Sequence, residues 1–118
     1  MQKLITKEVE KKLPKIDSNC SIYTTGTSND KVLVHYFSPY MDWYVTHYDP
    51  DKKLFYGLVK NREKYQGITQ DFYEYGFFSL RDFEEYNSRS FLSMIERDQY
   101  WFSPNKAPTT AEVMGANS

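Results

Sequence analysis

The sequence of 118 residues has a single cysteine, Cys20, which excludes an intramolecular disulfide. It has no cysteine pair that could begin a zinc-binding motif and no glycine-rich phosphate loop, because Gly57, Gly67 and Gly76 are isolated. No run approaches the roughly 20 apolar residues of a membrane span, and the charged N-terminus does not resemble a signal peptide. We therefore expect a cytoplasmic protein without a cofactor or metal.

Charge of one sign is not in excess either. The chain has 15 Lys and Arg residues against 16 Asp and Glu residues, with a formal net charge of -1. This balance disfavours a simple basic clamp on duplex DNA, because neutralisation of phosphates dominates that kind of binding. The charges are unevenly spread, however. Residues 3–15 contain five lysines against two glutamates, whereas residues 69–98 contain seven acids against three arginines.

Aromatic residues are what the chain has in abundance. They make up 18% of it, with 11 Tyr, 8 Phe and 2 Trp, although hydrophobic residues in total are only 40% and the mean hydropathy is -0.73. Rings must therefore fill a large share of the core. A chain of this length can bury roughly two thirds of its unfolded surface, which suits one domain. We place that domain at residues 1–103 and expect a mobile C-terminal tail at 104–118.

Two segments rich in β-branched and aromatic residues, 31–37 and 42–48, predict a β-hairpin. Residues 38–41 between them contain a proline, which suits a tight turn. If the first and last of these turn residues pair, the apolar side chains of the two strands share one face. The facing pairs in this register are Val34 with Val45 and Tyr36 with Trp43.

The same composition predicts further strands over 54–59, 72–78 and 95–102. Residues 60–71 are polar, so a loop is expected there. Three side chains of the third strand are expected to extend the apolar face of the hairpin: Leu54, Tyr56 and Leu58.

Two short helices carry capping signals. Residues 6–13 have Thr6 as N-cap, an acid in the first turn and lysines in the last. Residues 80–87 follow Ser79 as N-cap, with Phe78 and Phe83 spaced as a hydrophobic staple. The fold class predicted is α+β: a small single domain with an antiparallel sheet of four to five strands, arranged as a meander and covered on one face by two or three short helices.

His35 and His47 are the residues that would suit acid–base catalysis. In the register above, His35 pairs with Tyr44 and His47 pairs with Val32. This places the two histidines on different faces of the sheet. A three-residue turn would instead place both histidines on one face. No spacing of nucleophile and base is recognisable, and Cys20 lies in a polar loop without an evident base.

Three pairs of carboxylates are candidates for acid–base or metal chemistry: Asp49 with Asp51, Glu84 with Glu85, and Glu96 with Asp98. The first pair flanks a proline in a turn, where Asp commonly caps its own backbone. A divalent ion at the third pair would need further ligands that the sequence does not identify. The sequence therefore predicts no enzyme, no catalytic residue, no cofactor and no metal.

The acidic segment interleaves its carboxylates with tyrosines, which suggests a surface that binds a partner. The partner-binding residues predicted are Asp71, Tyr73, Glu74, Tyr75, Asp82, Glu84, Glu85 and Tyr86. Such a surface suits a basic protein better than nucleic acid, because like charge against phosphate costs affinity. It could occupy a groove that normally holds nucleic acid.

Several blocks of sequence, in their order and spacing, also carry a resemblance. The blocks are LITKE (4–8), KLPK (12–15), YFSP (36–39), WYVT (43–46), YDP (48–50), LFYGLV (54–59), GFFSL (76–80), IERD (95–98) and FSP (102–104). Together they resemble a family of small bacterial proteins of unknown function that are encoded largely on plasmids, phages and other mobile elements. The chain departs from that family over 60–75, where 65–71 resembles an insertion, and in its C-terminal tail.

The resemblance brings no activity or catalytic residue, but it implies a context. Short, acidic, non-catalytic proteins of mobile elements are often antagonists of host defence. We therefore expect an interaction protein that inhibits a host defence nuclease of the CRISPR or restriction type through its acidic, Tyr-rich surface. The alternative is an accessory protein that binds single-stranded nucleic acid with the basic first helix, including Lys7, Lys11 and Lys12, and with sheet aromatics such as Tyr44.

Overall fold

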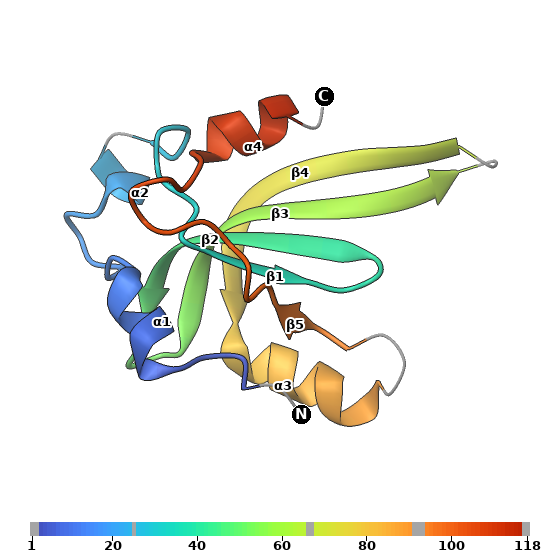
Figure 1. Cartoon of the computed structure of the whole chain (residues 1–118), viewed down its shortest axis with the longest axis horizontal. Helices are drawn as coiled ribbons and strands as arrows, with labels where there is room; N and C mark the ends of the chain where they lie inside the picture. The colour runs from blue at the N-terminus through green and yellow to red at the C-terminus, as the bar shows by residue number, and fades with distance from the viewer. Residues whose placement is uncertain (1–2, 25, 66–67, 91–93, 117–118) are drawn as a thin grey trace.

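Five antiparallel strands form one sheet in the computed structural model (Figure 1), which describes residues 3–24, 26–65, 68–90 and 94–116. The strands are β1 (Val34–Phe37), β2 (Met41–Asp49), β3 (Leu54–Tyr65), β4 (Ile68–Ser79) and β5 (Glu96–Arg97). Their order is β4-β3-β2-β1-β5, so the first four form a meander and β5 pairs with β1. The hairpin of β3 and β4 extends beyond the rest of the molecule in Figure 1. The α+β class and the antiparallel meander are confirmed.

Four helices occur in the described part of the chain: α1 (Lys7–Lys12), α2 (Ser21–Thr24), α3 (Leu80–Arg89) and α4 (Thr110–Ala116). The capping predictions for α1 and α3 are confirmed, because Thr6 accepts from the amide of Val9 and Ser79 accepts from the amide of Asp82. The helices cover both faces of the sheet, whereas the sequence predicted that they cover only one face. None of the helices described is long and apolar enough to cross a membrane.

The predicted register of the first hairpin is confirmed. The Ser38 amide donates to the Met41 carbonyl at 2.9 Å, and Val34 lies opposite Val45. Tyr36 likewise lies opposite Trp43, and His35 lies opposite Tyr44. The two faces defined by this register are called the first face, which carries Tyr36 and Val45, and the second face, which carries His35 and Tyr44.

A β-bulge in β2 overturns two further predictions. The pairing of β2 with β3 shifts by one residue between Val45 and His47, so that His47 lies opposite Tyr56. By the alternation of β3 this is the face of His35 and Tyr44, whereas the predicted register placed the two histidines on opposite faces. Without the extra residue, the register at the turn would place Leu58 on the first face, as predicted. With it, Gly57 lies opposite Val45 and Leu58 moves to the second face. The same one-residue shift places the side chains of Phe55 and Val59 on the first face.

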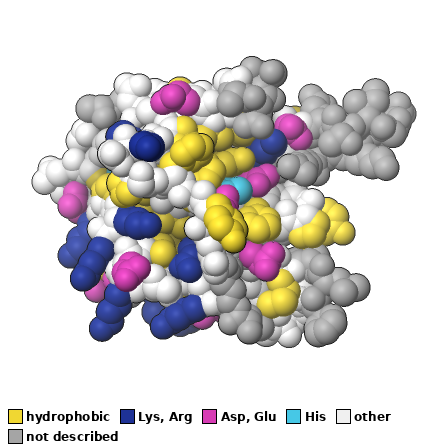
Figure 2. All heavy atoms as spheres, viewed as in Figure 1, with side chains coloured by type: hydrophobic (Ala, Val, Ile, Leu, Met, Phe, Trp, Pro, Cys, Tyr) yellow, Lys and Arg dark blue, Asp and Glu magenta, His cyan; other side chains and the backbone are white. Residues whose placement is uncertain are grey.

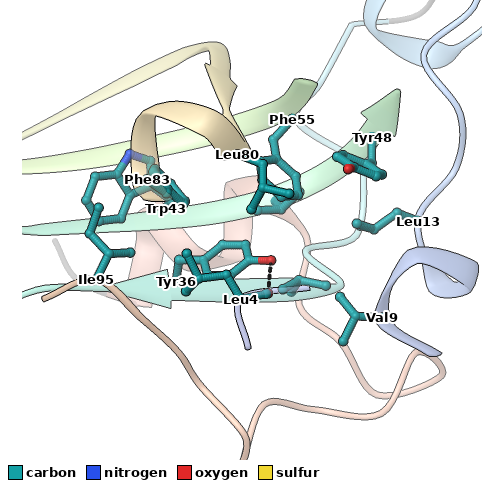
Figure 3. Close-up of a cluster of buried hydrophobic side chains, with 12 residues drawn as sticks. Leu4, Val9, Leu13, Tyr36, Trp43, Tyr48, Phe55, Leu80, Phe83 and Ile95 are labelled. Carbon is teal, nitrogen blue, oxygen red and sulfur yellow. Dashed lines mark hydrogen bonds between the residues drawn. The ribbon is translucent and has the colours of Figure 1, made fainter. Parts of the chain in front are cut away.

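The first face carries the larger core, which is built mainly from rings (Figure 3). Tyr36 and Phe55 are fully buried, and the Phe83 ring of α3 lies 5.3 Å from the Tyr36 ring in an edge contact. The Tyr36 hydroxyl donates to the Leu4 carbonyl at 2.6 Å, and burial raises the pKa of this phenol well above its usual value. The buried members of this core are Leu4, Val9, Leu13, Val34, Tyr36, Trp43, Val45, Tyr48, Phe55, Leu80, Phe83 and Ile95. The staple of Phe78 with Phe83 is confirmed, with ring centroids 5.7 Å apart.

The second face carries a smaller core of Val32, Tyr44, Leu58 and Val113, the last from α4. Residues 104–118 were expected to form a mobile tail. Instead, the described residues up to 116 include α4, and Thr110 is fully buried with its hydroxyl donating to the Thr27 carbonyl. The C-terminal segment therefore closes the second face of the sheet.

Two strand boundaries also differ from prediction. The polar residues 60–65 and 68–71 continue β3 and β4 instead of forming a loop. Of the predicted strand 95–102, only Glu96–Arg97 pairs with β1. Polar residues can pair in an extended hairpin because its ladder needs only backbone groups.

Candidate interaction surface

The structure divides the eight predicted partner-binding residues between β4 and α3. Within α3, Asp82, Glu84 and Glu85 are exposed, whereas Tyr86 is half-buried against the first core. This helix packs on the first face through Leu80 and Phe83. Its acids therefore lie on the outer side of the layer that covers the first face.

The alternation of β4 separates its four predicted residues. Glu74 lies opposite Val59 on the first face, the face that α3 covers. Tyr73 and Tyr75 lie opposite Lys60 and Leu58 on the second face, and Asp71 shares their side. The eight residues thus do not form one continuous patch on a single face.

The members on the second face make contacts within the chain. Asp71 lies 3.5 Å from the ammonium group of Lys60, whose side chain is buried. This ammonium group lies 5.8 Å above the Tyr73 ring. The Tyr75 hydroxyl donates to Thr110 Oγ1 at 3.0 Å and so joins β4 to α4. The charge of Asp71 offsets a buried cation, which reduces what it can offer a partner.

Two exposed rings on β4 were not among the predicted residues. Phe72 is 43% exposed and Phe77 is 49% exposed, on opposite faces of the strand. A hollow of about 400 Å³ lies beside them, and its lining includes Met41, Val59 and Glu74. Exposed apolar side chains gathered around a hollow are typical of interaction sites. The sequence signal was the aromatic run itself, but only the sheet order shows that this strand lies at an edge.

The exposed rings lie on a strand at the edge of the sheet, where a partner could reach them. One side of β4 pairs with β3, and no strand among the described residues pairs with its other side. An edge of this kind presents backbone N–H and C=O groups to a strand of another chain. The exposed rings and Glu74 flank that edge. We call the outer edge of β4, with Phe72, Glu74, Tyr75 and Phe77, the β4 edge surface.

His35 lies on the second face between two carboxylates. Its Nε2 is 2.8 Å from Asp42 Oδ1, and its Nδ1 is 3.1 Å from Asp98 Oδ2. The ring stacks on Tyr44 at 4.8 Å and contacts Trp101 at 5.0 Å. Both contacts to carboxylates are hydrogen bonds only when both ring nitrogens carry a proton. Both ring nitrogens of His35 are therefore engaged by carboxylates.

His47 belongs to a separate group of side chains. Its Nε2 lies 3.2 Å from Ser21 Oγ and its Nδ1 lies 2.8 Å from Thr46 Oγ1. Burial lowers the pKa of His47, and the nearby carboxylates of Asp30 and Asp17 oppose that shift. The contact with Ser21 has the distance of a nucleophile and its base. However, the Ser21 hydroxyl donates to Asp30 Oδ1 at 2.5 Å, so its proton is directed away from the histidine.

The other predicted chemical groups have structural roles or lie apart. Asp49 accepts from the amides of Asp51 and Lys52, as expected for a turn. Asp98 contacts His35, whereas Glu96 is exposed. In the part of the chain that the structure describes, no three His, Cys, Asp or Glu side chains are grouped as metal ligands.

Cys20 and Tyr44 have different exposures. Cys20 is half-buried and lines the hollow that also contains Ser21 and His47. Tyr44 is only 7% exposed, because it packs between His35 and the second core. It is therefore not positioned to stack on a nucleobase, as the nucleic-acid alternative required.

Comparisons with known proteins give no match for this chain among family models, curated proteins or solved structures.

Proposed function

We propose that this protein is a non-catalytic, cytoplasmic interaction protein of a mobile genetic element that inhibits a host defence nuclease of the CRISPR or restriction type. The β4 edge surface carries the proposal, because it combines an open strand edge with exposed rings and an acid. The mobile element and the nuclease target rest on the sequence resemblance. The interaction surface is narrower than the eight residues predicted, since Asp71 and Tyr73 contact Lys60.

The proposed mode of binding is addition of a partner strand to β4. Backbone hydrogen bonds would supply affinity, and side chains on alternate faces would supply specificity. Phe72 and Phe77 would each contact the partner on one face of the extended sheet. Glu74, with the acids of α3 beyond it, favours a basic partner, and basic surfaces are typical of grooves that bind nucleic acid.

The contacts of the two histidines support a role without catalysis. Both ring nitrogens of His35 face carboxylates, and both ring nitrogens of His47 face hydroxyl groups. A general base needs a nitrogen within reach of a substrate proton. Side chains of the chain itself hold both rings in this arrangement, and the Ser21 hydroxyl directs its proton to Asp30, which favours a structural role.

An inhibition assay with purified CRISPR and restriction nucleases tests the proposal. We expect the wild-type protein to form a complex with one such nuclease and to suppress its DNA cleavage. The double variant Phe72→Ala/Glu74→Lys should weaken the complex by about tenfold or more, because interface rings contribute strongly to affinity. The control Tyr40→Ala/Asp51→Lys changes one exposed ring and one exposed acid elsewhere on the surface.

The proposal fails if no nuclease of either type is bound or inhibited. The assignment of binding to the β4 edge surface is wrong if the control variant loses as much affinity as the β4 variant. Thermal unfolding of both variants checks that they fold. We expect both to fold, because all four substituted side chains are exposed.

A further inference from the structure

A large hollow lies away from the β4 edge surface. It is a cleft of about 720 Å³ between α1, the start of β1 and residues 97–102. This volume is in the range of small-molecule sites. We call it the α1 cleft.

Two rings at fixed positions form one wall of the α1 cleft. The Trp101 indole N–H donates to the Val32 carbonyl at 2.8 Å, and the ring contacts His35. Phe102 is 52% exposed and stands against Trp101, with ring centroids 5.1 Å apart and planes at 80°. Because Trp101 is already held in place, little conformational entropy would be lost when a flat ligand packs against this wall.

Cations also line the α1 cleft. Lys7 and Lys12 from α1 and Arg97 from β5 all belong to its lining. Figure 2 shows Lys and Arg side chains gathered over the end of the molecule where α1 lies, with apolar side chains beside them. The cleft therefore places positive charge next to aromatic surface.

The lining has fewer acids than cations. Asp98 directs one carboxylate oxygen to His35 and accepts the Tyr100 amide with the other. Among the described lining residues, Glu8 and Asp98 stand against Lys7, Lys12 and Arg97. A ligand that is anionic at one end and aromatic at the other matches this arrangement.

We propose that the α1 cleft binds a nucleotide, with the base against Trp101 and Phe102 and the phosphate near Lys7 and Lys12. The nucleotide is either free or part of a single-stranded nucleic acid, since both present the same ring and phosphate. The inference does not depend on the proposed inhibition of a nuclease, because it concerns a different part of the surface. It replaces the buried Tyr44 with two accessible rings as the stacking platform.

Tryptophan fluorescence and fluorescence anisotropy test the proposal directly. Trp43 is buried in the first core, so quenching by AMP, or by unlabelled oligo-dT or oligo-U, should report on Trp101. AMP should quench and inorganic phosphate alone should not. Labelled oligo-dT and oligo-U separate the two sources, because they should bind more tightly than AMP if the strand is the ligand.

Matched variants locate the site. Lys7→Gln/Lys12→Gln should weaken oligonucleotide binding about tenfold or more and make the dependence of log K on log salt shallower by about 1.4, for two cations on a single strand. The control Lys52→Gln/Arg89→Gln removes two exposed cations elsewhere and should leave both quantities unchanged. Phe102→Ala should abolish most of the quenching, whereas Tyr40→Ala should not.

The proposal is overturned if neither AMP nor either oligonucleotide binds at low salt. It is equally overturned if the control pair loses as much affinity as the Lys7/Lys12 pair. These results would leave the inhibition of a nuclease through β4 unaffected.

Discussion

On the first face of the sheet, rings pack against rings, whereas on the second face a histidine and a lysine lie among carboxylates. Tyr36 and Phe55 are buried by apolar contacts with several neighbours. His35 and Lys60 are nearly as enclosed, but each lies within ion-pair distance of an acid. An apolar core tolerates repacking, whereas a buried charge depends on a particular partner.

This difference shows how one sheet can serve two purposes. The first face stabilises the fold through α1 and α3. On the second face, Asp98 and Trp101 join the segment 95–102 to β1 and its neighbours. The second face thereby positions the wall of the α1 cleft.

The largest effect is expected on the first face. Phe55→Ala should lower the free energy of unfolding by about 3–5 kcal/mol, because a fully buried ring leaves a cavity among Tyr36, Tyr48 and Phe83. Phe77→Ala, on the neighbouring strand but half-exposed, should cost about 1 kcal/mol or less. Urea unfolding measures both, and equal losses would contradict the assignment of the core.

A smaller effect is expected from His35 on the second face. His35→Gln should cost about 2 kcal/mol, because Gln cannot keep the contacts of both ring nitrogens with Asp42 and Asp98. In the background Asp98→Asn the same substitution should cost less, since one of the two carboxylates is then neutral. A double-mutant cycle measured by urea unfolding gives this coupling. Strict additivity would show that His35 contributes by apolar contact alone.

Much of the first face could be predicted from sequence, because its signals are local. Strand composition and the turn gave the register of Val34 with Val45, and the Ser79 cap with its staple gave α3. The side assigned to Leu58 was wrong because a bulge depends on two strands at once, and no residue near Thr46 announces it. The position opposite Val45 requires a glycine, because a Cβ at Gly57 would overlap the Tyr44 carbonyl.

The second face could not be predicted, because its contacts join distant residues. His35 meets Asp98 across 63 positions, and Thr110 meets Thr27 across 83. Residues 104–118 lack periodicity, so only tertiary contacts reveal that α4 packs on the sheet. The candidate surface on β4 was found in part, since acids and tyrosines were visible in the sequence but the edge position was not.

The smallest effect expected is the pH dependence of His47, which tests whether the second face also contains a neutral histidine. Burial lowers the pKa of His47 in the folded state below its unfolded value of 6.5. The unfolded chain therefore takes up this proton first, so stability is fully present above pH 6.5 and is lost as the pH falls below it. The contribution of His47 to the slope of the free energy of unfolding against pH is at most about 1.4 kcal/mol per pH unit.

The comparison of wild type with His47→Gln isolates this contribution. Urea unfolding between about pH 5 and about pH 8, the range in which histidine titrates, should show a steeper acid loss for the wild type. Asp30 and Asp17 are present in both proteins, so their own titration cancels in the difference. A difference that stays constant across the range would mean that His47 keeps its ordinary pKa. The network of Ser21 and Thr46 would then hold the ring without excluding its charged form.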